Sequence, residues 1–316
     1  MLKFVLITVD DIQISVDNII NYELTRGIDA PCDGLRLRIY SDTLVDEIAC
    51  IKAYYNNKIV FNGYVDTQRQ EVNSQGYNVF FYARSSACIL IDSEADPITY
   101  NCPSSSVLWY KNAYNLGFTN DLPNVAINDY YEVQKGTSCY GVINNFIKAL
   151  TGNGIYVDSD NKIKLLKSND SLIIDKNDVL SEKKNINRGL CTSLIDYKSH
   201  SDTTYNHHLK SKYLQKKGIL KNKKLNTQSL PNWQRHKSIE NKFTSSIENY
   251  YTCEFLLSGI KKAKLCDKII YNSEKLGDYN NYLISSITYK KDKNGITTKI
   301  CAYKNIDLEV ISYVAE

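Results

Sequence analysis

Residues 82–100, YARSSACILIDSEADPITY, carry the side chains best suited to chemistry: an arginine, three serines, a cysteine and three carboxylates. A hydrolase nucleophile at a strand-to-helix turn would need the pattern Gly-x-Ser-x-Gly, which is absent. Ser85 and Ser86 are instead residues that cap a helix, and Pro97 stops one. We therefore interpret the stretch as a structural corner, where a β-barrel ends and another module begins. The apolar residues expected to close the barrel end are Ala87, Ile89, Leu90 and Ile91, and the carboxylates at the exit are Asp92, Glu94 and Asp96.

Three histidines raise the question of a metal site: His200, His207 and His208 lie close in sequence to Cys191 and Asp202. A metal site needs ligands at a defined spacing, such as two histidines separated by about three to five residues. Adjacent residues of a strand point to opposite faces, so His207 and His208 cannot bind one ion. We expect exposed polar residues in a loop, with no metal and no other cofactor.

The nine cysteines are scattered, and no two form a Cys-x-x-Cys motif. This pattern favours free thiols in a reducing compartment over disulfides or a zinc site. Cys139 lies at the start of an expected helix, where a lowered thiol pKa would produce a nucleophile. No pattern of a paired histidine and an orienting asparagine or aspartate accompanies it. We therefore expect Cys139 to pack in the core or to be a half-buried thiol, and we predict that the protein is not an enzyme.

Residues 209–225, LKSKYLQKKGILKNKKL, contain seven lysines and no acidic residue. Arginine is absent and Tyr213 is the one aromatic residue, so base stacking and bidentate contacts to nucleic acid are poorly served. A solvated hairpin and a protein-docking loop remain the two interpretations, and we expect no specific nucleic-acid partner. The candidate partner-binding residues are Lys210, Lys212, Lys216, Lys217, Lys221, Lys223 and Lys224.

The composition sets broad limits on the class of protein. A chain of 316 residues with 43% hydrophobic content can form two or three small domains with their own cores. Its formal net charge of +4 does not by itself imply nucleic acid. No apolar run approaches the roughly 20 residues that cross a bilayer. Residues 1–9 lack the features of a signal peptide, so we expect a first strand there, no membrane partner, and a protein kept inside the cell until it is released.

Short segments dense in β-branched and aromatic residues alternate with turn residues in the first 96 positions, which favours an antiparallel barrel or sandwich. Residues 97–171 differ, because serine caps and helical spacing predict helices at 104–116 and 137–150, followed by a hairpin at 154–166. The last part is β-rich again, with one helix expected at 235–250. The predicted strands are 2–9, 19–25, 35–40, 48–55, 59–65 and 77–83, then 179–187, 190–197, 251–258, 267–271, 282–290 and 297–303.

Residues 50–84 and 266–304 present the same features in the same order. In each, a strand ends in Tyr-Asn, a longer strand with a charged extension follows, and a glycine turn leads to a closing strand. Residues 19–27 and 179–189 show a weaker likeness. We infer an internal duplication. The predicted fold is mainly β: two tube-like antiparallel β-barrels with a small α+β module inserted between them. The predicted domains are 1–96, the inserted module at 97–171, and 172–316 with a Lys-rich hairpin and one helix.

Three stretches resemble the baseplate hub proteins of contractile phage tails: the late control protein D family, the Mu hub, and the XkdQ-like hubs of defective prophages and R-type bacteriocins. They are YELTRGIDAP at 22–31, ARSS with LIDSEADP within 83–97, and residues 136–157, a short helix that leads into YVDSDN. The likeness is patchy but follows the chain in order. It rests on structural motifs, and the Lys-rich segment has no counterpart in it.

The resemblance implies a homotrimer, in which two barrels per chain make a ring of six. Such a ring would stack on a hexameric tail tube and seat a trimeric central spike. The implied partners are the tail tube protein, the central spike protein, baseplate wedge proteins and the tape measure protein. Assembly would take place in the bacterial host cytoplasm, and the protein would belong to the baseplate of a phage tail or bacteriocin particle. The predicted function is a structural baseplate hub, and Phe80→Asp or Ile300→Asp in the closing strands is expected to abolish assembly.

A tail component that binds peptidoglycan or hydrolyses the cell wall is the alternative function. Under that interpretation, residues 97–171 would be a peptidoglycan-binding domain of LysM type. A secreted-effector or spike-like role is a third possibility, which the lack of a repetitive β-helix sequence disfavours.

Overall fold

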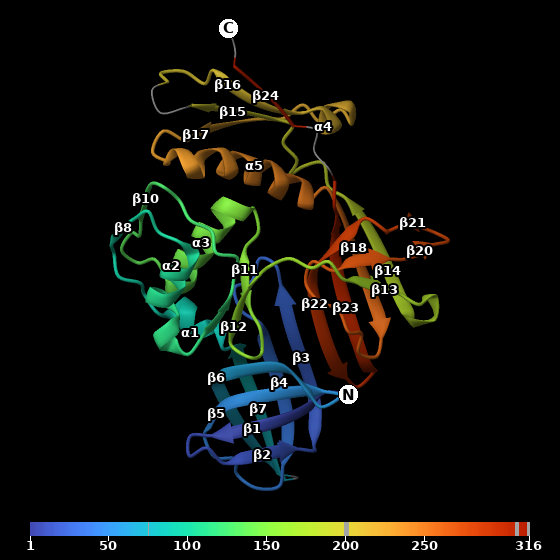
Figure 1. The fold of residues 1–316 in the computed structure, drawn as a ribbon. Helices are drawn as coiled ribbons and strands as arrows, with labels where there is room; N and C mark the ends of the chain where they lie inside the picture. Colours follow the sequence, from blue (N-terminus) through green and yellow to red (C-terminus); the bar gives the residue numbers. More distant parts are fainter. Residues whose placement is uncertain (75, 199–201, 307–309, 315–316) are drawn as a thin grey trace.

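A computed structural model describes residues 1–74, 76–198, 202–306 and 310–314 of the chain. Its main element is a sheet of 13 strands, in which two curved halves are joined edge to edge (Figure 1). The fold is mainly β, as predicted. The strands of this sheet are β1 (Lys3–Thr8), β2 (Gln13–Val16), β3 (Ile19–Gly27), β4 (Gly34–Ser41), β5 (Ile48–Tyr55), β6 (Lys58–Asn73), β7 (Gly76–Ser85), β13 (Ser171–Ile173), β14 (Val179–Ile186), β18 (Tyr251–Ser258), β19 (Lys268–Ile270), β22 (Tyr282–Asp292) and β23 (Gly295–Lys304).

The main path of the sheet runs β14-β18-β23-β22-β3-β4-β7-β6-β5-β1-β2, and β19 pairs with both β22 and β13. Neighbours along this path are antiparallel, whereas β13 and β19 are parallel. Strand β3 of the first half pairs with β22 of the second, residues 22–27 against 286–291. The two predicted barrels therefore share one continuous sheet.

The hydrophobic core is also continuous across this joint. Inward-pointing residues of both halves form one apolar cluster, because successive residues of a strand alternate between the two faces. Leu24 on β3, Ile287 on β22 and Ile300 on β23 are fully buried in it. The two halves are therefore one packing unit, and a defect in one half is expected to destabilise both.

An α+β module lies between the halves in sequence and surrounds a second apolar cluster (green in Figure 1). Its main helix begins after Ser138, whose hydroxyl accepts a hydrogen bond from the Gly141 N–H at 3.1 Å, and ends at Gly152, where φ is 81°. The two predicted helices and the hairpin are confirmed. The elements are α1 (Ala87–Asp92), β8 (Thr99–Asn101), α2 (Ser105–Asn112), η1 (Tyr114–Leu116), β9 (Thr119–Asp121), β10 (Tyr130–Glu132), α3 (Cys139–Thr151), β11 (Ile155–Val157) and β12 (Lys162–Leu165).

A small four-stranded sheet and a long helix lie together at one end of the molecule (top of Figure 1). Ile239 and Phe243 of the helix pack against Ile195 and Leu209 of the sheet. The helix starts three residues earlier than predicted, directly after Pro231. The elements are β15 (Leu194–Lys198), β16 (His207–Ser211), α4 (Lys212–Lys216), β17 (Asn222–Asn226), α5 (Asn232–Glu248) and β24 (Val310–Val314); elsewhere lie η2 (Lys176–Asp178), β20 (Asn272–Ser273) and β21 (Gly277–Asp278).

The prediction of a Lys-rich hairpin at residues 209–225 is wrong. Strand β16 leads into helix α4, and β17 then pairs in parallel with β15 instead of returning beside β16. The Ser211 hydroxyl caps the helix by accepting from the Leu214 N–H, and Leu214 and Ile219 are buried against Cys191. The described part of residues 172–316 thus holds two α-helices, α4 and α5, where one was predicted. No helix among the described residues is both long and apolar enough to cross a membrane.

Candidate assembly surface

The two halves of the large sheet repeat one topology. The first half contains the strand order β3-β4-β7-β6-β5, and the second contains β14-β18-β23-β22-β19. Each strand of one half therefore has a counterpart at the same place in the other, and both sets follow the same chain order. This match supports the predicted internal duplication.

Irregularities of the strands match as well. The residue pairing shifts at Asp66 in β6 and at Ser285 in β22, the same distance from the hairpin turn. It also shifts at Ile20 in β3 and at Leu180 in β14. Because a bulge is a specific local feature, two coincident bulges are strong support for a common origin of the halves.

The closing strands β7 and β23 bury equivalent positions. Phe80 in β7 and Lys299 in β23 occupy equivalent positions that point outward, each between two buried residues of its strand. Phe80 is 36% exposed. The structure therefore predicts that Ile300→Asp disrupts a buried closing strand more severely than Phe80→Asp, and the effect of either variant on assembly stays a prediction. The buried residues are Val79, Phe81 and Ala83 in β7, and Thr298, Ile300 and Ala302 in β23.

The joint between β3 and β22 shows how one half binds the other. Residues 22–27 and 286–291 pair in antiparallel register, and the hydroxyls of Thr25 and Thr288 lie 3.3 Å apart across it. Glu23 stands opposite Lys290 in the same register. The Lys291 ammonium donates to the Ile19 carbonyl at 2.9 Å. Backbone pairing, a hydroxyl contact and opposite charges thus act together at this joint.

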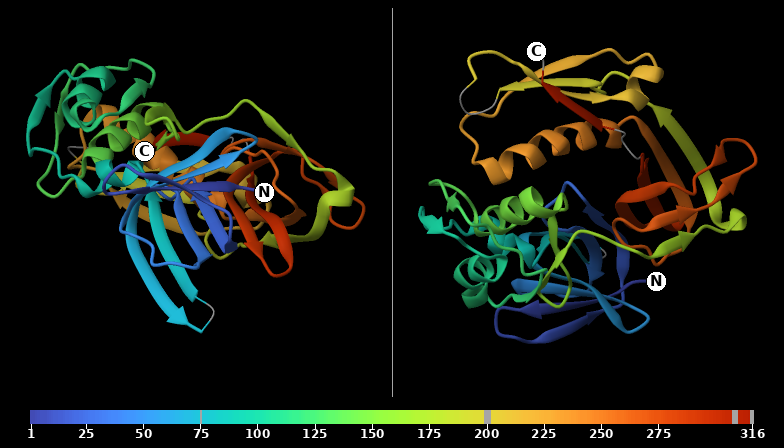
Figure 2. Two further views of the ribbon diagram at one scale, coloured as in Figure 1. Left: turned by 90° about the horizontal axis from the view of Figure 1, so that it is seen from below. Right: turned by 45° about the horizontal axis from the view of Figure 1, so that its top comes forward.

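Two edges equivalent to those of the joint remain available for pairing. In the described part of the chain, β14 is paired with a strand on one side only, namely with β18. Strand β6 is paired with β5 up to Tyr64, and beyond this residue it pairs with β7 alone among the described strands. The β6–β7 hairpin projects from the body of the molecule (Figure 2, left). Edges of this kind are sites at which strands of another chain can add.

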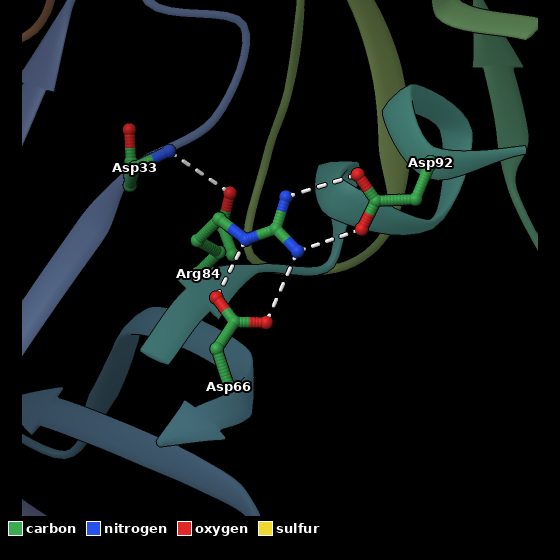
Figure 3. Close-up of polar contacts among 5 residues, drawn as sticks. Asp33, Asp66, Arg84 and Asp92 are labelled. Carbon is green, nitrogen blue, oxygen red and sulfur yellow. Dashed lines mark hydrogen bonds and ion pairs between the residues drawn. The ribbon is translucent and has the colours of Figure 1, made fainter. Parts of the chain in front are cut away.

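The corner at residues 82–100 is built around Arg84 (Figure 3). Its guanidinium donates to both oxygens of Asp66 at 2.6 and 3.0 Å, and to both oxygens of Asp92 at 3.1 and 2.6 Å. The Asp33 N–H donates to the Ser85 hydroxyl at 3.0 Å. Strand β7 ends at Ser85 and α1 begins two residues later, so the interpretation as a structural corner is confirmed.

Two details of the corner differ from the prediction. Ser86 makes no side-chain cap, because its backbone is already helical, with φ −52° and ψ −22°, whereas a capping side chain needs an extended backbone. Leu90 is fully buried, but in the cluster of the α+β module and not in the barrel end. Helix α1 therefore anchors the module.

Arg84→Met is expected to lower the free energy of unfolding by about 1 kcal/mol, since both carboxylate partners are partly exposed to solvent. Hydrogen bonds from Arg84 lower the pKa of Asp92. A carboxyl pKa lowered by folding stabilises the protein above the unfolded value of about 3.9, and this stability is lost as the pH falls through the folded value. In urea unfolding, the difference in the free energy of unfolding between wild type and Arg84→Met should therefore become smaller below about pH 4.

Arg69→Met is the matched control for the corner. Arg69 also pairs with a carboxylate, that of Glu71, but its side chain is 72% exposed. We expect no measurable change in stability for this control. A loss in Arg84→Met that stays constant down to acidic pH would contradict the role assigned to the Arg84–Asp92 pair.

Within the described part of the chain, the structure does not bring the other candidate residues together as a catalytic or metal site. Burial raises the pKa of Cys139, the opposite of what a nucleophilic thiolate needs. His208 pairs with Asp196 at 2.6 Å and His207 with Asp202 at 2.9 Å, from opposite faces of β16. Because both histidines lie in a strand and are half-buried, the prediction that they are exposed loop residues is wrong. The described residues contain no cluster of three or more potential metal ligands. His200 lies outside the described residues.

The seven lysines lie on β16, α4 and β17 and in the segment that joins α4 to β17, and several make contacts within the chain. Lys221 donates to the Gly189 carbonyl at 2.5 Å, while the ammonium groups of Lys217 and Lys224 lie over the rings of Tyr213 and Tyr205. Their role in binding a partner stays a prediction. Sequence reasoning did not identify the edge of β6 beyond Tyr64 as a surface for assembly. The polar, charged residues that continue this strand could have indicated it.

Neither a protein-family model nor any curated protein matches the chain in sequence. In structure, the chain is similar to the 43 kDa tail protein of prophage MuSo2 from Shewanella oneidensis, with a TM-score of 0.78 and 14% identity over 96% of this chain and 98% of that one. A tail protein from Neisseria meningitidis MC58 gives 0.77 and 11% over 96% and 97%. The chain has the fold of phage tail proteins.

The chain is also similar in structure to a component of a type VI secretion system. The E. coli c3393 protein is described as a component of the type VI secretion system with structural similarity to the T4 bacteriophage tail proteins gp27 and gp5. It aligns with a TM-score of 0.59 and 8% identity over 92% of this chain and 74% of that one. The predicted resemblance to tail proteins is thus confirmed at the level of the fold.

Proposed function

We propose that the chain is a structural baseplate hub of a contractile phage tail or tail-like bacteriocin, with no enzymatic role. In this proposal three chains form an adaptor between the hexameric tail tube and the trimeric central spike. The observation that carries it is the repeated half-sheet, with matching strand order and bulges. The fold shared with tail proteins supports it.

The repeat matters because of symmetry. Three identical chains with two similar halves each offer six similar surfaces, as a hexameric tube requires. The halves are not identical, so the same ring keeps a true three-fold axis, which suits a trimeric spike. One chain that contains two similar halves therefore resolves the mismatch between six-fold and three-fold partners.

The other parts of the chain fit this proposal. The inserted module at 97–171, between the halves at 1–96 and 172–316, would add contacts outside the ring, to the baseplate wedge proteins or to the tape measure protein. We propose that the lysine-bearing surface docks an acidic partner protein through Lys212, Lys216 and Lys223, whose residues are exposed. No membrane or specific nucleic-acid partner is part of the proposal.

Sedimentation and electron microscopy of the purified full-length chain test this function. We expect a particle of three times the 36.1 kDa chain mass, seen end-on as a ring with six lobes and a central channel. A chain that stays monomeric at all concentrations, and also in the presence of its co-expressed spike and tube proteins, would refute the hub. Binding to purified peptidoglycan or lysis in zymography would instead support the cell-wall alternative.

A further inference from the structure

Within one chain, the β3–β22 joint provides a template for contacts between chains. By the matched bulges and turns, the part of β6 from Thr67 to Val72 corresponds to residues 286–291 of β22. Likewise, residues 182–187, which run from β14 to one residue past its end, correspond to residues 22–27 of β3. The two edges that are unpaired in the described chain are therefore the counterparts of the two edges that already bind each other.

The edge of β6 is accessible to an added strand. A groove of about 420 Å³ lies along it, between the edge residues from Val65 to Gln70 and the loop that contains Val45 and Glu47. Gln70 holds this loop in place through the Val45 backbone. In the second half, Tyr289 holds the equivalent loop through the Lys261 carbonyl, and β3 still fits beside β22 there. The loop in the first half therefore leaves room for a strand in the same position.

Charges at equivalent positions of the two halves are reversed. In the first half, Glu23 on β3 pairs with Arg36 on β4 at 3.5 Å. In the second half, Lys183 on β14 pairs with Glu254 on β18 at 2.9 Å. The same reversal holds on the opposite edge, where Glu71 in β6 is the counterpart of Lys290 in β22.

We propose that β14 of one copy adds antiparallel to the outer edge of β6 of a second copy, with Arg69 opposite Asn185 and Glu71 opposite Lys183. The proposal deepens the proposed hub function and rests on it, since it names the contact that closes the ring. The pairing of Glu71 with Lys183 reproduces that of Lys290 with Glu23 with the signs exchanged.

The reversed charges also determine which half meets which. If β3 of one copy met β6 of another, Glu23 would stand opposite Glu71. If β14 met β22, Lys183 would stand opposite Lys290. Like charges directly opposite each other destabilise a strand pair, whereas opposite charges stabilise it. First and second halves therefore alternate around the ring, and two like halves do not bind each other.

Cysteine cross-linking tests the register. Arg69 and Asn185 correspond to Thr288 and Thr25, whose hydroxyls lie 3.3 Å apart, so cysteines at these positions are close enough for a disulfide. We would mix the single variants R69C and N185C of the full-length chain, oxidise them mildly, and examine them by non-reducing electrophoresis and peptide mass spectrometry. We expect a covalent dimer linked between residues 69 and 185. The double variant R69C/N185C should give covalent trimers.

Three controls accompany this experiment. The T25C/T288C variant should form a disulfide within one chain, which shows that the chemistry works at the template joint. Mixing R69C with K183C shifts the pair by two residues on the same face, and it should cross-link at least about fivefold more slowly. The wild-type chain, with its nine native cysteines, should give no covalent dimer under the same oxidising conditions.

A charge exchange gives a second measurement. Glu71→Lys should weaken trimer formation about fivefold per contact in sedimentation, and adding Lys183→Glu should restore it. Trimers that form without any cross-link between 69 and 185, while T25C/T288C closes, would overturn this pairing and leave the hub function standing. A chain that neither cross-links nor forms trimers would overturn both.

Discussion

Ile300→Asp is expected to abolish the cooperative unfolding transition of the whole large sheet. Ile300 has no exposed surface, and its neighbours across the sheet are Phe255 and Ile287. A carboxylate there would be buried without a partner, which costs at least about 4 kcal/mol and is comparable with the stability of many domains. Because the core cluster runs through both halves, the first half should unfold as well. Far-ultraviolet circular dichroism during a urea titration measures this loss.

Phe80→Asp is the matched control, because Phe80 is next to the equivalent position in the other closing strand. Its outward counterpart, Lys299, already carries a charge at that place. We expect a loss of about 1 to 2 kcal/mol in the free energy of unfolding, because most of the Phe80 side chain is covered, but the cooperative transition should remain. If Ile300→Asp unfolds at the same urea concentration as the wild type, the buried position assigned to β23 is wrong. Loss of particles with Ile300→Asp would report on folding and not on contacts between chains.

Gly63→Ala is expected to destabilise the first half by about 2 to 3 kcal/mol, although alanine is usually the better residue in a strand. A β-carbon at Gly63 would lie 2.3 Å from the Arg84 carbonyl oxygen and 2.4 Å from the Phe61 ring. The carbonyl belongs to the neighbouring strand β7 and cannot move aside without breaking the ladder. The change should appear as a lower midpoint in thermal unfolding.

Gly34→Ala in β4 separates this clash from the general effect of replacing a glycine. The nearest atoms to a β-carbon at Gly34 belong to the Tyr82 side chain at 3.9 Å, which is ordinary contact. We expect this variant to be as stable as the wild type or more stable by up to about 1 kcal/mol. Equal stability of the two variants would show that β6 and β7 separate easily at Gly63.

Much of the sheet could be predicted from the sequence, since the signals are local. The alternation of Val79, Phe81 and Ala83 identifies β7 and its buried face. Ser138 and Gly152 bracket α3 with standard capping chemistry. The duplication could also be predicted from the sequence, because the glycine of each hairpin turn aligns the two repeats.

The remaining features depend on contacts between distant residues. Pairing of β3 with β22 brings together Thr25 and Thr288, and nothing in either strand alone specifies this partner. The end of β6 is polar because it extends past the core. It is a strand nevertheless, because its backbone pairs with β7. Helix α4 was missed because its stability comes from burial of Leu214 and Ile219 in a cluster formed by distant residues. The structural corner was predicted, but its Arg84 carboxylate pairs depend on Asp66 in another strand.

The covalent link between the two halves has a consequence for the assembly of the proposed ring. In a ring of three chains, three of the six joints are of the β3–β22 kind and already exist in each chain before any encounter. Six separate halves would lose translational and rotational freedom five times on closing a ring, whereas three linked pairs lose it twice. Each encounter also brings two halves at once, at the high effective concentration that a tether confers. Rings should therefore complete at lower protein concentration than a hexamer of single halves would require.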